Sequence, residues 1–100
     1  MATIRQSEKP HELWLRDGRP EEALTAARAS AGRDARLYLP RIVEAAALHT
    51  LARAEEARVA LAAARRLRPG LTPVEVEHAH GRHVARQIVS LWPAGELPLA

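Results

Sequence analysis

Two segments of the chain match each other at a fixed spacing, and this match favours an architecture built from repeated units. Residues 18–24 read GRPEEAL and residues 52–58 read ARAEEAR, so the two segments lie 34 residues apart. The same offset aligns Trp14 with Leu48 and Ala27 with Leu61. A fixed period of this length is typical of proteins in which one helical unit is repeated and stacked on its neighbour.

The apolar residues of the chain are of the kind that favours helices. There are 21 alanines and 13 leucines, against six valines, three isoleucines and no phenylalanine. Ala and Leu are strong helix formers, whereas the β-branched and aromatic residues that favour strands are scarce. We therefore predict an all-α protein of about five helices, arranged as two antiparallel helix-turn-helix repeats and a long C-terminal capping helix.

Proline, glycine and capping residues divide the chain into the predicted helices. Serine or threonine accepts a backbone N–H at a helix start, proline fits the first turn, and glycine closes the last turn. These signals predict helices over about 7–17, 20–31, 39–52, 54–67 and 72–91. We expect residues 1–6 to be a flexible N-terminus, 7–92 to form one helical domain and 93–100 to be an irregular tail.

The last predicted helix has the clearest start in the chain. Thr72 and Glu75 form a capping box around Pro73 at the first helical position. The predicted apolar stripe consists of Val74, His78, Gly81, Ala85, Ile88 and Trp92. Because a glycine inside a helix costs roughly 1 kcal/mol, we expect Gly81 to serve a close crossing with another helix.

The matched segments carry several residues in a recognisable order. These are the pairs Glu22-Ala23 and Glu56-Ala57, the later Leu61 and Pro69, and Trp14 before the first pair. In this order they resemble tetratricopeptide repeats, in which a Glu-Ala pair opens the second helix and a proline ends it. The early Trp, Leu and Gly of that family are absent from both units. Residues 51–73 are also similar to the closing repeat in the C-terminal helical regions of bacterial cyclases and winged-helix regulators.

The resemblance implies a groove lined by the first helix of each repeat. The positions that carry over are Glu8, Glu12, Leu15, Arg16, Leu39, Ile42, Ala46 and His49. A short peptide or a protein segment is the expected ligand. The alternative is that these residues pack on the last helix or on a dimer partner. Because repeat arrays need about three units for stability, two units favour a homodimer or a docked fragment.

A cluster of histidines and a cluster of arginines can each be explained without a specific binding site. His80 and His83 are weak candidates for binding zinc or nickel, but they lack the His-Glu-x-x-His spacing, and we predict no metal and no cofactor. We expect His78 at the edge of the core, and His80 and His83 in water. Arg65, Arg66 and Arg68 complement the helix dipole at a C-terminus. No aromatic residues are interleaved with them, so we expect no specific nucleic-acid binding.

The sequence carries no catalytic motif that would predict an enzyme. The chain contains no cysteine, no glycine-rich phosphate loop and no run of about 18 apolar residues that would span a membrane. We therefore expect a cytoplasmic, non-catalytic adaptor or scaffold of a bacterial signalling or regulatory system. The alternatives are a structural or dimerising segment of a larger regulator and, with less support, a metal- or nucleic-acid-binding helical protein.

Overall fold

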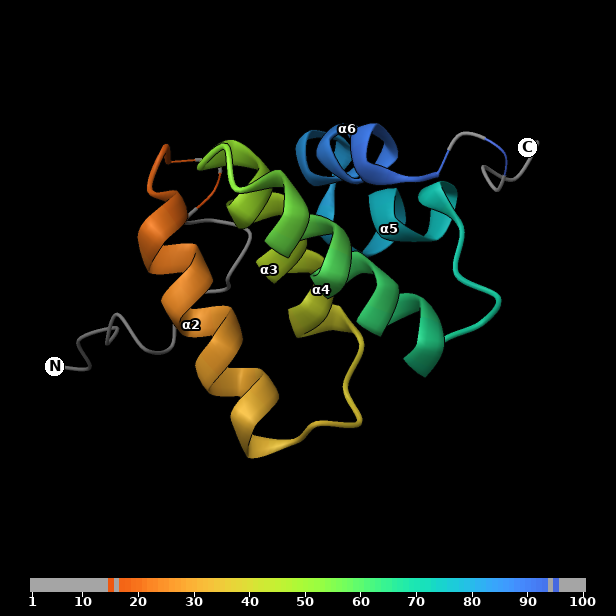
Figure 1. Ribbon diagram of the computed structural model, residues 1–100, viewed down its shortest axis with the longest axis horizontal. Helices are drawn as coiled ribbons and strands as arrows, with labels where there is room; N and C mark the ends of the chain where they lie inside the picture. Colours follow the sequence, from red (N-terminus) through yellow and green to blue (C-terminus); the bar gives the residue numbers. More distant parts are fainter. Residues whose placement is uncertain (1–14, 16, 94, 96–100) are drawn as a thin grey trace, which may run out of the picture.

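The computed structural model describes residues 15, 17–93 and 95, and this part of the chain is all-α (Figure 1). It contains the helices α2 (Pro20–Arg33), α3 (Leu39–Thr50), α4 (Ala54–Leu67), α5 (Pro73–His80) and α6 (Arg82–Leu91), and no strand. The predicted N-terminal segment 1–6 lies outside the described residues, as do nearly all of the predicted first helix and of the tail. Within the described residues, no helix combines the length and the apolar character needed to cross a membrane.

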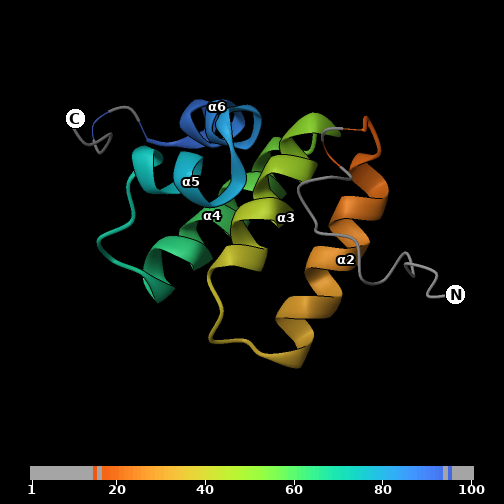
Figure 2. The same cartoon turned by 180° about the vertical axis from the view of Figure 1, so that it is seen from behind.

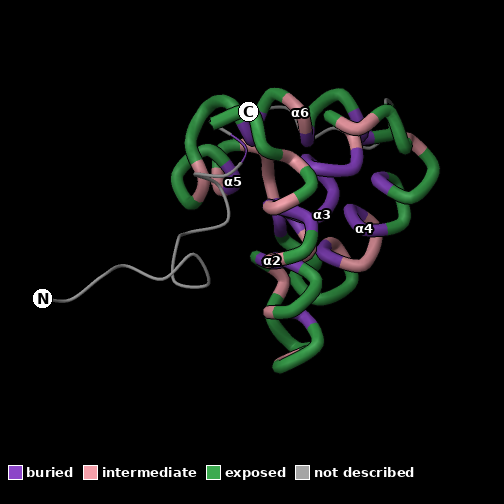
Figure 3. Tube along the Cα trace, turned by 90° about the vertical axis from the view of Figure 1, so that its left-hand side faces the viewer, coloured by how far each residue is buried: buried purple, intermediate pink, exposed green. Residues whose placement is uncertain are grey.

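Helix α3 forms the centre of the structure, with α2 on one side and α5 and α6 on the other (Figures 1 and 2). Its buried residues are Pro40, Ile42, Val43, Glu44, Ala45, Ala46, Ala47 and Leu48. They lie on every side of the helix, so the trace of α3 is almost continuously buried (Figure 3). A helix that is apolar all round is typical of a core position. As predicted, α3 begins at Leu39 and takes Pro40 into its first turn.

Helices α2 and α4 pack on α3 through faces made mainly of alanine. The buried residues are Ala23, Leu24, Ala27 and Ala31 in α2, and Ala57, Ala60, Leu61 and Ala64 in α4. Small side chains allow the helix backbones to lie close together. Leu67, at the end of α4, is 41% exposed and does not belong to this buried face.

The 34-residue correspondence is also present in the backbone. Helices α2 and α4 are both 14 residues long, and a residue with positive φ precedes each by two positions, Gly18 at +72° and Ala52 at +61°. The N–H of Gly18 donates to the carbonyl of Leu15 at 3.1 Å, and the N–H of Ala52 donates to that of His49 at 3.0 Å. The aligned segments therefore fold into the same local turn and helix.

The prediction of a single helix over 72–91 is wrong, because the structure has two helices, α5 and α6, separated by a turn at Gly81. Gly81 has φ +90° and ψ 170°, and α5 and α6 fold back to pack on each other. The predicted close crossing at Gly81 is also wrong, since a Cβ atom there would meet nothing within 4 Å. The fold-back turns α5 onto another face, so Val74 and His78 are exposed and Val76 is buried. In α6 and just after it, the predicted Ala85, Ile88 and Trp92 are buried.

Two caps also differ in detail from the prediction. The hydroxyl of Thr72 accepts the N–H of Glu75 at 3.2 Å, which confirms half of the capping box. The Glu75 carboxylate instead binds Tyr38 and Arg68, so it is occupied by tertiary contacts. Gly32 does not end α2, which continues to Arg33 before Asp34 caps it.

Hydrogen bonds and cation–π contacts join helices α5 and α6 to the rest of the structure. The hydroxyl of Tyr38 donates to Glu75 at 3.1 Å, and the Nε of Arg68 donates to the same carboxylate oxygen. The Arg68 guanidinium lies 5.5 Å from the centre of the Tyr38 ring, and that of Arg65 lies 5.0 Å from the Trp92 ring. Arg68, followed by Tyr38, lowers the pKa of Glu75, while burial and then Glu75 raise the pKa of Tyr38.

Candidate functional site

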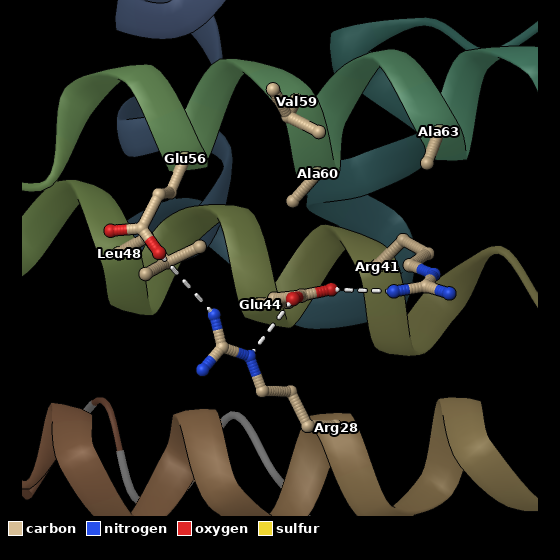
Figure 4. Close-up of a pocket in the computed structure, with 8 residues that line it drawn as sticks. All are labelled: Arg28, Arg41, Glu44, Leu48, Glu56, Val59, Ala60 and Ala63. Carbon is tan, nitrogen blue, oxygen red and sulfur yellow. Dashed lines mark hydrogen bonds and ion pairs between the residues drawn. The ribbon is translucent and has the colours of Figure 1, made fainter.

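A groove lies between α2 and α4, with α3 as its floor (Figure 4). Its volume is about 330 Å³. The residues that line it are Arg28 from α2, Arg41, Glu44 and Leu48 from α3, and Glu56, Val59, Ala60 and Ala63 from α4. The groove exists because α2 and α4 both pack principally on α3, which leaves the space between them to side chains. We call this feature the α2–α4 groove.

A chain of ion pairs crosses the α2–α4 groove. Glu44, whose surface is only 8% exposed, accepts hydrogen bonds from the Nε of Arg28 at 3.1 Å and from Nη1 of Arg41 at 3.0 Å. The Nη2 of Arg28 lies 3.8 Å from Glu56, which is held in turn by Arg53 at 2.6 Å. A buried carboxylate needs such partners, because an unpaired buried charge is strongly unfavourable.

The partners also set the ionisation of the exposed end of this chain of ion pairs. The hydrogen bonds from Arg53 lower the pKa of Glu56, and Arg28 adds a smaller electrostatic contribution. Conversely, Glu56 raises the pKa of Arg53. The groove therefore presents fixed charges of both signs near neutral pH.

An apolar strip runs beside these charges, made by residues of α4 and by Leu48 of α3. Ala60 and Leu48 are buried, Ala63 is half-buried, and Val59 at the rim is 66% exposed. A large exposed apolar residue beside a hollow lined by small side chains leaves room for an apolar side chain from another molecule. The arrangement has the elements of a recognition surface, namely an apolar contact area flanked by oriented charges.

The predicted groove of the two first helices is not assembled by the described residues. Glu8, Glu12 and Arg16 lie outside them, and Leu15 is buried. Ile42 and Ala46 have no exposed surface, so the prediction that they line an open groove is wrong. The reason is that α6 packs on α3 within the same chain, which is the alternative stated from the sequence.

The other two predicted groove residues keep partial exposure. Leu39 is 39% exposed at the start of α3. His49 is half-buried, and its Nδ1 lies 3.3 Å from the side-chain oxygen of Gln87 in α6. His49 therefore belongs to the contact between α3 and α6.

The histidines are separated by the turn at Gly81. His80 ends α5 and His83 lies in the first turn of α6, so the two do not share one helix face. His83 is exposed, as predicted, whereas His80 buries both ring nitrogens and His78 is exposed, contrary to the prediction. Among the residues that the structure describes, no group of three or more His, Asp or Glu side chains is placed to hold a metal ion.

Sequence reasoning missed the two residues that organise the α2–α4 groove, Arg28 and Glu44. A signal for Glu44 was present, because it is the single charged residue in the apolar run IVEAAAL over 42–48. A charge at such a position needs a partner from another element. Arg28 gave no comparable signal, since it is one of 14 dispersed arginines.

No family model, no curated protein and no solved structure matches this chain.

Proposed function

We propose that the chain is a non-catalytic protein–protein interaction module that binds a segment of another protein in the α2–α4 groove. The observation that carries this proposal is the pairing of an apolar strip with oriented charges over the floor formed by α3. Glu44 fixes Arg28 and Arg41 at the floor, while Val59 leaves apolar surface exposed beside them. Preorganised side chains lose little entropy when a partner binds.

The wider setting of the proposal follows from the repeat. Matching turns before α2 and α4 and matching helix lengths support a relationship to tetratricopeptide-type repeats. On this basis we propose an adaptor or scaffold of a bacterial signalling or regulatory system that works in the cytoplasm. The proposed binding surface lies between the second helices of the two units, α2 and α4, and the first helix of the second unit, α3, forms its floor.

A structural role in a larger regulator is the second candidate. The contact between His49 and Gln87 favours it, because α6 already occupies the face of α3 that the resemblance assigned to a ligand. In that case α2–α4 groove variants would lower the stability of the fold and leave no separate effect on binding.

A pair of substitutions in α4 tests the interaction proposal. Ala63→Arg places a long side chain across the groove, whereas Ala62→Arg adds the same group at a neighbouring half-buried position that does not line it. Arginine is a good helix former, so both variants are expected to keep α4 intact. The unmodified chain is first used to capture partners from extracts of the native host, and binding of each captured protein is then measured by calorimetry.

The proposal predicts a selective result. Ala63→Arg should weaken binding of a captured protein about tenfold or more, and Ala62→Arg should leave the affinity within about twofold of the unmodified chain. A tenfold change in affinity corresponds to about 1.4 kcal/mol of binding free energy. Equal binding by both variants would rule out the α2–α4 groove as the contact surface. Equal loss in both, together with a lower unfolding temperature, would support the structural role.

A further inference from the structure

The break makes Gly81 the N-cap residue of α6. This residue supplies no side-chain capping hydrogen bond, and the first turn of α6 contains no acidic residue. A helix start normally needs such groups, because its first N–H groups have no partners within the helix. Glycine itself has no side chain to supply one.

Hydrogen bonds of the α-helical type, from residue i to residue i−4, are present on both sides of Gly81. The N–H of Gly81 donates to the carbonyl of Glu77 at 2.8 Å, and the N–H of Ala85 donates to that of Gly81 at 3.2 Å. Only three hydrogen bonds of a continuous helix are missing, from the N–H groups of residues 82–84 to the carbonyls of residues 78–80. Straightening at Gly81 would form all three.

The fold-back of α5 and α6 therefore depends on the backbone torsion angles of one residue, Gly81. The combination of φ +90° and ψ 170° at Gly81 belongs to a region that is essentially restricted to glycine. Nothing lies within 4 Å of a Cβ built there, so a side chain would meet no steric obstacle. Alanine at this position would be opposed by its own backbone preference and would also favour a continuous helix.

The two helices are attached to the core by different kinds of contact. The start of α5 is fixed by the Thr72 cap and by the bonds of Glu75 to Tyr38 and Arg68. Helix α6 packs on α3 and α4 through an apolar face. In addition, the hydroxyl of Thr50 donates a hydrogen bond to the side-chain oxygen of Gln87 at 2.6 Å. The residues of that face are Val84, Ala85, Ile88 and Leu91.

We propose that a second copy of this chain can replace α6, so that two chains exchange their α6 helices and form a dimer. In the dimer each chain carries one continuous helix over residues 73–91, and each α6 packs on α3 and α4 of the other chain. The occupant must be α6 itself, because the surface of α3 and α4 is complementary to this face and to Gln87. Exchange of identical elements through a hinge is a low-cost route to dimers.

The first test is the variant Gly81→Ala. Two chains are relieved of the unfavourable torsion when they exchange, so the association constant should rise about a hundredfold or more. Sedimentation velocity at low micromolar concentration should show a dimer for this variant and a monomer for the unmodified chain. Gly18→Ala is the matched control, because Gly18 also has positive φ with open space around it, and it should remain monomeric. A Gly81→Ala chain that folds and stays monomeric would overturn the proposal.

The second test identifies the exchanged helix. The chain has no cysteine, so His49→Cys and Gln87→Cys introduce the only thiols, at two side chains that touch in the structure. A chain carrying both substitutions should be joined within itself by a short reagent that links two thiols, which checks the geometry. When chains carrying one substitution each are mixed in the Gly81→Ala background, the same reagent should give a cross-link between chains.

The cross-linking experiment also decides the other outcomes. A dimer of Gly81→Ala without the cross-link between His49→Cys and Gln87→Cys chains would reject exchange of α6. If Gly81→Ala fails to fold, the same mixture with Gly81 is refolded at high protein concentration. A cross-link between chains then supports the exchange, and its absence rejects it.

Discussion

Helices α2 and α4 have the same length and follow the same turn, but their surroundings differ. Within the described part of the chain α2 packs on α3, whereas α4 packs on both α3 and α6. The two helices also differ in side chains at aligned buried positions, where α2 has the small Ala27 and α4 has the larger Leu61. The repeat therefore determines the local backbone, and the residues that differ between the two copies determine what each helix contacts.

The largest expected effect comes from making α4 more like α2. Leu61 is 2% exposed, and Leu61→Ala removes three buried carbon atoms between α4 and its neighbours. We expect a loss of about 2–5 kcal/mol in the free energy of unfolding, measured by urea denaturation. The reverse change, Ala27→Leu, should cost about 1–3 kcal/mol because α2 has no space for a larger side chain. A negligible cost for both would mean that the two helices are interchangeable.

The next effect concerns the ion pairs that link α2 to α3. Glu44→Ala leaves the guanidinium groups of Arg28 and Arg41 without their buried acceptor, and we expect a cost of about 1–3 kcal/mol by the same measurement. Glu55→Ala is the control, because the side chain of Glu55 is 92% exposed and exposed pairs contribute little. If both variants have the same stability, the contacts of Glu44 do not hold α2 in place.

The helices of the core are the part of the fold that the sequence predicts well. Proline at 20, 40 and 73, together with alanine at helical spacing, defines the starts of α2, α3 and α5 because these signals act locally. The turn at Gly81 was missed for the same reason. Apolar residues continue at helical spacing across it, so no local pattern marks the place where α6 folds back onto α3.

The candidate site was predicted less well than the fold. The predicted groove included residues of α3 such as Ile42, which is buried. The local signals that mark the start of a helix do not reveal which of its faces another helix covers. The α2–α4 groove depends on Arg28 reaching from α2 to Glu44 in α3, a contact between residues 16 positions apart. Side-chain contacts of this kind follow from the three-dimensional packing of the helices and not from a local pattern.

A smaller effect separates the two matching turns. Gly18 adopts a left-handed conformation that suits glycine, whereas Ala52 adopts it at a conformational cost. Gly18→Ala should therefore lower the free energy of unfolding by roughly 0.5–1 kcal/mol, and Ala52→Gly should raise it by a similar amount, after allowing for the entropy of the unfolded chain. Opposite signs in thermal unfolding would confirm that the turns are equivalent. Equal signs would show that they are held by different contacts.

The smallest expected effect is the response of the two helix starts to acid. The pKa of Glu22 is lowered by its own backbone N–H and then by Arg19, and that of Glu56 is lowered mainly by Arg53. Because both values lie below the ordinary 4.5, each carboxylate stabilises the fold above about pH 4.5. That stabilisation is lost as the pH falls through the lowered pKa.

The two carboxylates should differ in the size of this response. Glu56 has two hydrogen bonds from Arg53, at 2.6 and 2.7 Å, and a contact with Arg28, whereas Glu22 has one bond from Arg19 at 3.0 Å. Glu56→Gln should therefore flatten the fall in unfolding temperature between about pH 5 and pH 3 more than Glu22→Gln does. An equal flattening would show that the link from α4 to Arg28 adds nothing to the local pair. Among the residues that the structure describes, that result would leave Glu44 as the carboxylate through which Arg28 joins the helices across the α2–α4 groove.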